Sequence, residues 1–198
     1  GDHRDLHCVT LRQSNMCIRD LYSLHIQMNE DEKLEIDVNH FEFFAEHDKD
    51  PRRSIAESMI KNFPKDGTII AYNQSFEKRC VQSLAEYCPD LSDELLALNE
   101  RFIDLIEPFR GGGFYHSKFK GSFSIKNVLP VICPSNSVLD YKALDINNGG
   151  MAMSAYKELR NSSKNVDIET TRKNLFKYCR LDTYAMYAIY IKLLQIIK

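Results

Sequence analysis

Apolar and polar residues alternate along this chain with two different periods. Residues 21–28, Leu-Tyr-Ser-Leu-His-Ile-Gln-Met, alternate with a period near two, which predicts a strand. Residues 67–72 form a short apolar run after a glycine turn signal, as expected of a buried strand, and residues 102–106 form a third strand-like stretch. Residues 1–20 show neither period, so we expect an irregular N-terminal arm there and a folded domain over residues 21–198.

Helical spacing fills the regions between and after these strands. Asp50 and Pro51 are suited to begin a helix that ends before Pro64, because apolar residues recur there at helical spacing. A further helix is predicted to begin within residues 73–77 and to run to about residue 87. Others are predicted at about residues 92–99, 124–132, 151–159 and 168–197, the last of them long, amphipathic and free of Gly and Pro. Because helices alternate with strands, the predicted fold class is α/β, with a layered sheet rather than a helical bundle.

The composition is that of one globular domain. The chain has 198 residues, 43% of them hydrophobic and 27% charged, which is enough for one sizeable core. No run approaches the roughly 18 apolar residues that a membrane span needs, and the polar start does not resemble a secretory signal, so we expect a cytoplasmic protein without a membrane partner. The six cysteines form no CxxC pair, which favours free or buried thiols over disulfides or a zinc site.

A basic and aromatic segment stands out against the net charge of −2. Residues 108–139 contain no acidic residue but carry Lys118, Lys120 and Lys126 among glycines and aromatic rings. Such a segment can contact phosphates and stack bases, which makes these three lysines candidate substrate contacts. A loop that is merely solvated explains the same composition, so both interpretations stay open.

Two short motifs carry carboxylates that could form a catalytic site. Glu77 closely follows a predicted buried strand, so we expect it at the carboxyl end of the sheet, where open α/β sheets bind ligands. Tyr178 and Asp182 lie four residues apart on the long C-terminal helix and therefore share one face. A tyrosine one turn from a carboxylate is more often structural than catalytic, so the argument depends on the combination of the two motifs.

This combination resembles the DEDD-type 3′–5′ exonucleases of the ribonuclease H-like superfamily. Asn73-x-x-Phe76-Glu77 is similar to their second motif, with Glu in place of the usual Asp, and Tyr178-x3-Asp182 is similar to the third motif of the tyrosine subclass. From about residue 21 onward the chain also resembles the DUF2779 family, at residues 50–53, 72–78, 101–105, 121–130 and 178–186.

The resemblance implies a ribonuclease H-like layered sheet flanked by helices and two-metal hydrolysis of single-stranded DNA or RNA. It assigns binding of Mg²⁺ or Mn²⁺ to Glu77 and Asp182, orientation of the attacking water to Tyr178, and the nucleotide pocket to Asn73 and Phe76. Asp104 would either contact the metal ions or cap a neighbouring segment.

The first exonuclease motif, Asp-x-Glu on the opening strand, is absent from this sequence, so the first strand is expected to be missing or altered, as in a shortened chain. Two carboxylates neutralise half the charge of two divalent cations, so we expect weak metal binding and little turnover. A longer form with Asp-x-Glu is expected to degrade single strands from the 3′ end. The alternatives are a non-catalytic nucleic-acid or protein-binding module with this fold, and a cysteine-dependent hydrolase. The choice between DNA and RNA, and the oligomeric state, stay open.

Overall fold

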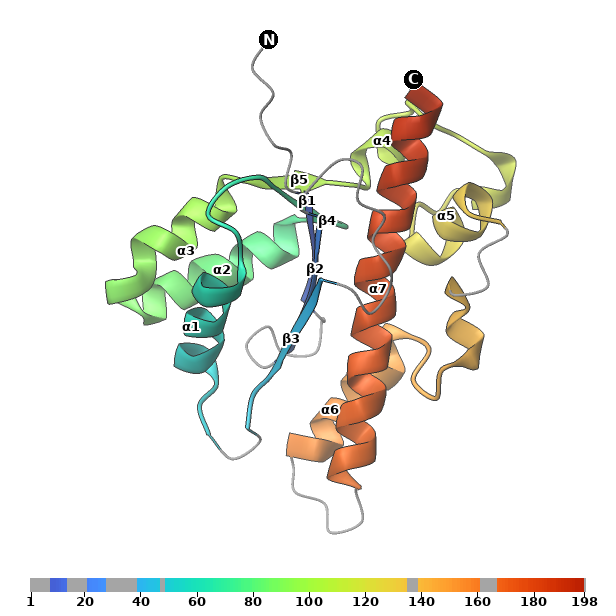
Figure 1. The fold of residues 1–198 in the computed structure, drawn as a ribbon. Helices are drawn as coiled ribbons and strands as arrows, with labels where there is room; N and C mark the ends of the chain where they lie inside the picture. Colours follow the sequence, from blue (N-terminus) through green and yellow to red (C-terminus); the bar gives the residue numbers. More distant parts are fainter. Residues whose placement is uncertain are drawn as a thin grey trace.

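A mixed five-stranded sheet lies between two layers of helices in the computed structural model (Figure 1). The structure describes residues 8–13, 21–27, 39–46, 49–134, 139–160 and 167–197, with the backbone alone for residues 8–13 and 160. The strand order is β3-β2-β1-β4-β5, with β1 antiparallel to β2 and parallel to β4. The strands are β1 Cys8–Gln13, β2 Leu21–Gln27, β3 His40–Phe44, β4 Thr68–Ala71 and β5 Phe102–Asp104.

The helices divide between the two faces of the sheet. One layer holds α1, α2 and α3, and the other holds the long α7 with α5 beside it (Figure 1). Their bounds are α1 Arg52–Asn62, α2 Ser75–Tyr87, α3 Ser92–Asn99, α4 Glu107–Arg110, α5 Ile125–Ile132, α6 Gly149–Arg160 and α7 Ile168–Ile197. Within the described ranges, no helix combines the length and the hydropathy needed to cross a membrane.

Alternation along β4 explains why the sheet has an apolar core on each face. Ile69 and Ala71 belong to the core formed with α1, α2 and α3, whereas Ile70 belongs to the core formed with α5 and α7. All three side chains are fully buried, and successive residues of a strand point to opposite faces. Burial of each isoleucine contributes about 1.5–3 kcal/mol, so β4 stabilises both layers.

Alternation along β2 has a different outcome, because one of its faces is polar although it is also buried. Ser23 and His25 are fully buried beneath α7. The Oγ1 atom of Thr183 on α7 lies 2.7 Å from Nδ1 of His25 and 3.1 Å from Oγ of Ser23. The Ser23 hydroxyl also lies 2.8 Å from Nε2 of His40 on β3. These contacts satisfy buried polar groups and hold α7 in place against the sheet.

Most of the predicted elements are confirmed. The strand predicted at residues 21–28 is β2, and the helices predicted from periodicity correspond to α1, α2, α3, α5, α6 and α7. Two strands were not predicted, β1 and β3, and neither was the short α4. The broad expectation of an α/β fold with helices around a sheet is therefore confirmed.

The expectation of an irregular arm needs correction at residues 8–13, which form the central strand β1. The backbone of β1 pairs with β2 on one side and with β4 on the other, so partners distant in the sequence determine its conformation. The first strand is thus present, and its sequence, Cys-Val-Thr-Leu-Arg-Gln, contains no acidic residue. The other residues of the expected arm, 1–7 and 14–20, lie outside the described residues.

Candidate functional site

The connection between β4 and α2 is built around Asp104 at the end of β5. Its carboxylate accepts hydrogen bonds from the backbone N–H groups of Asn73 at 2.7 Å and Gln74 at 3.0 Å. Asn73 has a φ of 68°, a left-handed conformation that asparagine tolerates better than most residues. The chain therefore reverses sharply after β4, and α2 begins at Ser75.

The position of Asp104 favours its predicted capping role. The carboxylate accepts a third hydrogen bond, 3.1 Å long, from the backbone N–H of Ile106, so both of its oxygens are engaged by backbone donors. Asp104 does not line the pocket described below. The structure therefore gives Asp104 a structural role at the start of α2.

Glu77 occupies the first turn of α2 and is 2% exposed. The sharp reversal after β4 brings this carboxylate to the carboxyl end of the sheet, as the sequence predicted. A carboxylate in the first turn of a helix also interacts favourably with the helix dipole. The buried position in a mostly apolar layer is unusual for a glutamate, which marks Glu77 as a candidate functional residue.

Tyr178 and Asp182 lie one turn apart on α7 and are both buried, at 3% and 1% exposure. The Tyr141 hydroxyl donates a hydrogen bond of 2.6 Å to Oδ1 of Asp182. The Tyr141 ring also packs edge-on against Tyr178, with the ring centroids 6.2 Å apart. Tyr141 thus contacts both Tyr178 and Asp182, and no local pattern in the sequence identified it.

A pocket of about 330 Å³ lies beyond the carboxyl end of β4. It is bordered by Glu77 from α2, Tyr178 from α7 and Lys126 from α5, so both helical layers contribute to it. The full lining is Tyr72, Asn73, Phe76, Glu77, Ile106, Ser124, Ile125, Lys126, Gly149 and Tyr178. The structure therefore brings together five of the predicted site residues: Asn73, Phe76, Glu77, Lys126 and Tyr178.

The other predicted residues lie outside this lining. Asp182 is one turn from Tyr178 along α7, and Lys118 and Lys120 are exposed on the segment between α4 and α5. Lys126, in the lining, donates from Nζ to the backbone oxygen of Asn147 at 2.9 Å.

Tyr72, which lines the pocket, is linked to the segment between α4 and α5. The Tyr72 hydroxyl donates a hydrogen bond of 2.5 Å to the backbone oxygen of Phe123. Burial, together with the negative charge of Asp104, raises the pKa of the Tyr72 phenol, while Arg110 lowers it. The phenol is protonated at neutral pH, and the raised pKa keeps it a hydrogen-bond donor further into the alkaline range than an ordinary tyrosine.

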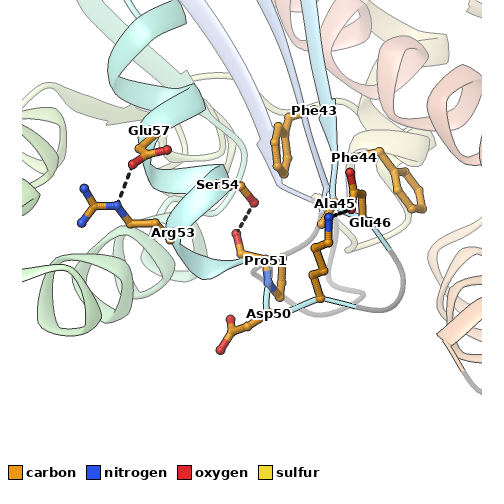
Figure 2. Close-up of a pocket in the computed structure, with 10 residues that line it drawn as sticks. Phe43, Phe44, Ala45, Glu46, Asp50, Pro51, Arg53, Ser54 and Glu57 are labelled. Carbon is orange, nitrogen blue, oxygen red and sulfur yellow. Dashed lines mark hydrogen bonds and ion pairs between the residues drawn. The ribbon is translucent and has the colours of Figure 1, made fainter.

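A second pocket, of about 370 Å³, lies between the end of β3 and the start of α1 (Figure 2). Its charged groups are paired with each other or with nearby residues: Arg53 donates to Glu57 at 2.7 Å and to Asp90 at 2.7 Å. The Ser54 hydroxyl donates to the backbone oxygen of Pro51, as Figure 2 shows. None of the predicted catalytic residues lies here, so the slightly smaller pocket between α2 and α7 is the better candidate site.

Metal binding depends on how many acidic or other ligating side chains converge. Among the described residues, no three His, Cys, Asp or Glu side chains gather into a group that could hold a metal ion. Glu77 and Asp182 are the two carboxylates of the predicted motifs, and Oδ1 of Asp182 already accepts the bond from Tyr141. The described side chains therefore do not form a centre for two divalent ions.

Comparison with known proteins identifies the family of the chain. A protein-family profile described as "Domain of unknown function (DUF2779)" matches residues 12–124, which is more than half of the chain. The match includes the β4–α2 junction with Glu77 and ends before α7, so it is shorter than the resemblance seen in the sequence. No curated protein and no solved structure matches the chain. The chain belongs to the DUF2779 family.

Proposed function

We propose that the pocket between α2 and α7 binds the 3′-terminal nucleotide of single-stranded DNA or RNA. The domain would then be a ribonuclease H-like relative of the DEDD-type 3′–5′ exonucleases. The observation that carries this proposal is that Glu77 and Tyr178, which are far apart in the sequence, border one pocket from opposite helical layers. The pocket volume also lies within the range of about 300–1,000 Å³ that is usual for small-molecule sites.

The lining supplies contacts that suit a nucleotide. The half-buried Phe76 ring offers an apolar surface for a base, and the exposed Asn73 side chain can donate to and accept from base edges. Lys126 brings a cation to the opposite wall, where a phosphate would gain from it. In this proposal Tyr178 lies beside the terminal sugar and Glu77 at the inner end of the pocket.

Hydrolysis needs more than this pocket supplies. Two hard divalent cations bring four positive charges, and the carboxylates of Glu77 and Asp182 neutralise half of them. The β1 strand, where the resemblance would place the other two acids, contains none. Because the described residues do not fit a two-ion centre, we expect this chain to bind single strands and to cleave them slowly or not at all.

The test separates binding from cleavage. Affinity for a fluorescent single-stranded oligonucleotide would be measured in EDTA, and cleavage of the same strand would be followed with Mn²⁺. We expect Phe76→Ala to weaken binding about fivefold or more, since an aromatic ring contributes about 1–3 kcal/mol per stacked base. Glu57→Gln, which removes an exposed acid at the other pocket, is the matched control and should leave the affinity unchanged.

Each result has a defined meaning. Equal affinities of the wild type and Phe76→Ala would contradict the assignment of the pocket to a nucleotide. Rapid cleavage of the strand by this chain would contradict the expectation drawn from its carboxylates.

The missing acids favour a second candidate function, a non-catalytic nucleic-acid or protein-binding module that keeps the fold. In that case oligonucleotide binding would weaken with salt, as phosphate contacts require, and no metal would produce degradation. A trace of Mn²⁺-dependent cleavage that is lost in Glu77→Gln would favour the exonuclease over the module.

A further inference from the structure

The segment between α4 and α5, residues 111–124, is a packed structure in spite of its glycines. Phe119 is fully buried at its centre. Five rings surround Phe119 with centroids 5.9–6.3 Å away, those of Phe109, Phe114, Tyr115, His116 and Phe123. Aromatic contacts at these distances are favourable, so the segment presents a defined surface.

One ring of this cluster is turned toward solvent. Tyr115 is 64% exposed, whereas Phe119, which it contacts edge-on at 6.2 Å, is inaccessible. Lys118 and Lys120 are both exposed and stand on either side of Phe119 in the sequence. Tyr115 is thus an exposed ring that packs on a buried ring, and two lysines lie close to it in the sequence. Surfaces that bind single-stranded nucleic acid have this composition.

The aromatic cluster beneath this surface is connected to the pocket. Phe123, which closes the aromatic cluster, accepts the hydrogen bond from Tyr72, and Tyr72 lines the pocket. The next three residues, Ser124, Ile125 and Lys126, also line it. A strand whose last nucleotide lies in the pocket would therefore pass along the α4–α5 segment.

We propose that Tyr115, Lys118 and Lys120 form a stacking and phosphate-binding surface for the nucleotides that precede the terminal one. This inference rests on the proposed function of the pocket and extends the binding site beyond it. The Tyr115 ring stacks on a base, and the two ammonium groups contact phosphates. The occupant is single-stranded nucleic acid because the charge is positive and residues 108–139 contain no acidic residue to oppose a phosphate backbone.

Oligonucleotides of different lengths test the proposal. Affinities of a dinucleotide and of a twelve-residue strand would be compared in EDTA, for DNA and for RNA. Tyr115→Ala is expected to weaken binding of the longer strand by about five- to 150-fold, the range of base stacking on an aromatic ring, and to leave the dinucleotide unaffected. Tyr115→Phe, which keeps the ring, should bind like the wild type.

The lysines are tested through salt dependence. Replacing Lys118 and Lys120 together by alanine should reduce the slope of log affinity against log salt by about 1.4, because each phosphate contact to a single strand contributes about 0.7. Lys61→Ala, which removes an exposed lysine from α1 on the other layer, is the matched control and should leave the slope unchanged.

The outcomes distinguish this surface from the pocket. Unchanged affinity of Tyr115→Ala for the longer strand overturns the inference, as does an equal loss for the dinucleotide or a preference for an acidic peptide over the oligonucleotide. If Tyr115→Ala weakens binding of the longer strand while Phe76→Ala changes the affinity for no oligonucleotide, the assignment of the pocket to a nucleotide is wrong and the assignment of the Tyr115 surface is kept. Thermal unfolding of each variant shows whether a loss of affinity reflects a loss of fold.

Discussion

Lowering the pH should destabilise this fold through His40. The imidazole of His40 lies between Ser23 and Glu42, and its side chain is 4% exposed. Burial, then the proximity of His25 and of Arg180, lowers the pKa of His40 from 6.5 to about 3. The Glu42 carboxylate lies 3.7 Å from Nδ1 of His40 and accepts a hydrogen bond from Arg180.

The sign and size of the effect follow from this shift. Above pH 6.5 the imidazole is neutral in both the folded and the unfolded state, so stability does not depend on it. Between pH 6.5 and about 3 the imidazole is protonated in the unfolded chain but neutral in the folded chain. The free energy of unfolding therefore decreases as the pH is lowered, by up to about 1.4 kcal/mol per pH unit. At pH 5 the loss amounts to about 2 kcal/mol.

Urea unfolding at pH 8 and pH 5 measures this loss. His40→Gln removes the titrating ring and keeps a polar group. From pH 8 to pH 5 the free energy of unfolding of this variant should decrease less than that of the wild type, and the difference should be about 2 kcal/mol. An NMR titration of the His40 ring in the folded wild type gives an independent reading of the same pKa. Parallel stability curves for the two proteins, or an NMR pKa near 6.5, would refute the reasoning.

Three further substitutions test individual contacts by urea unfolding. Tyr141→Phe removes the hydrogen bond to the buried Asp182 carboxylate and should cost about 1.5–3 kcal/mol; a loss no larger than that of the exposed Tyr115→Phe would contradict a role for this bond. Asp104→Ala removes two backbone contacts at the start of α2 and a third to Ile106, and should cost about 2 kcal/mol, with a smaller loss in Asp104→Asn; equal losses would speak against the capping role. Leu95→Ala should cost about 2–5 kcal/mol, since Leu95 is fully buried on α3; a loss below 1 kcal/mol would mean that the core there repacks.

Five of the predicted site residues line one pocket, and the position of most of them follows local rules. Glu77 lies in the first turn of the helix that follows β4, and Tyr178 and Asp182 lie one helical turn apart, so their local geometry depends on nearby residues. Tyr141 could not be predicted in this way, because its contacts with α7 join segments that are about 40 residues apart and share no periodicity. The role of Asp104 was undecided in the sequence for the same reason, since two of its three hydrogen-bond donors, Asn73 and Gln74, lie on the β4–α2 connection.

The sequence by itself determined most of the helices, the strands β2, β4 and β5, and the α/β class, because periodicity, turns and caps act over a few residues. Tertiary structure alone decided that residues 8–13 become the central strand, since this strand is held by pairing with β2 and β4 on either side. It also decided that the polar face of β2 is buried, because Thr183 on α7 satisfies Ser23 and His25. Backbone pairing and buried hydrogen bonds need partners from distant parts of the chain, and no local pattern specifies where those partners will be.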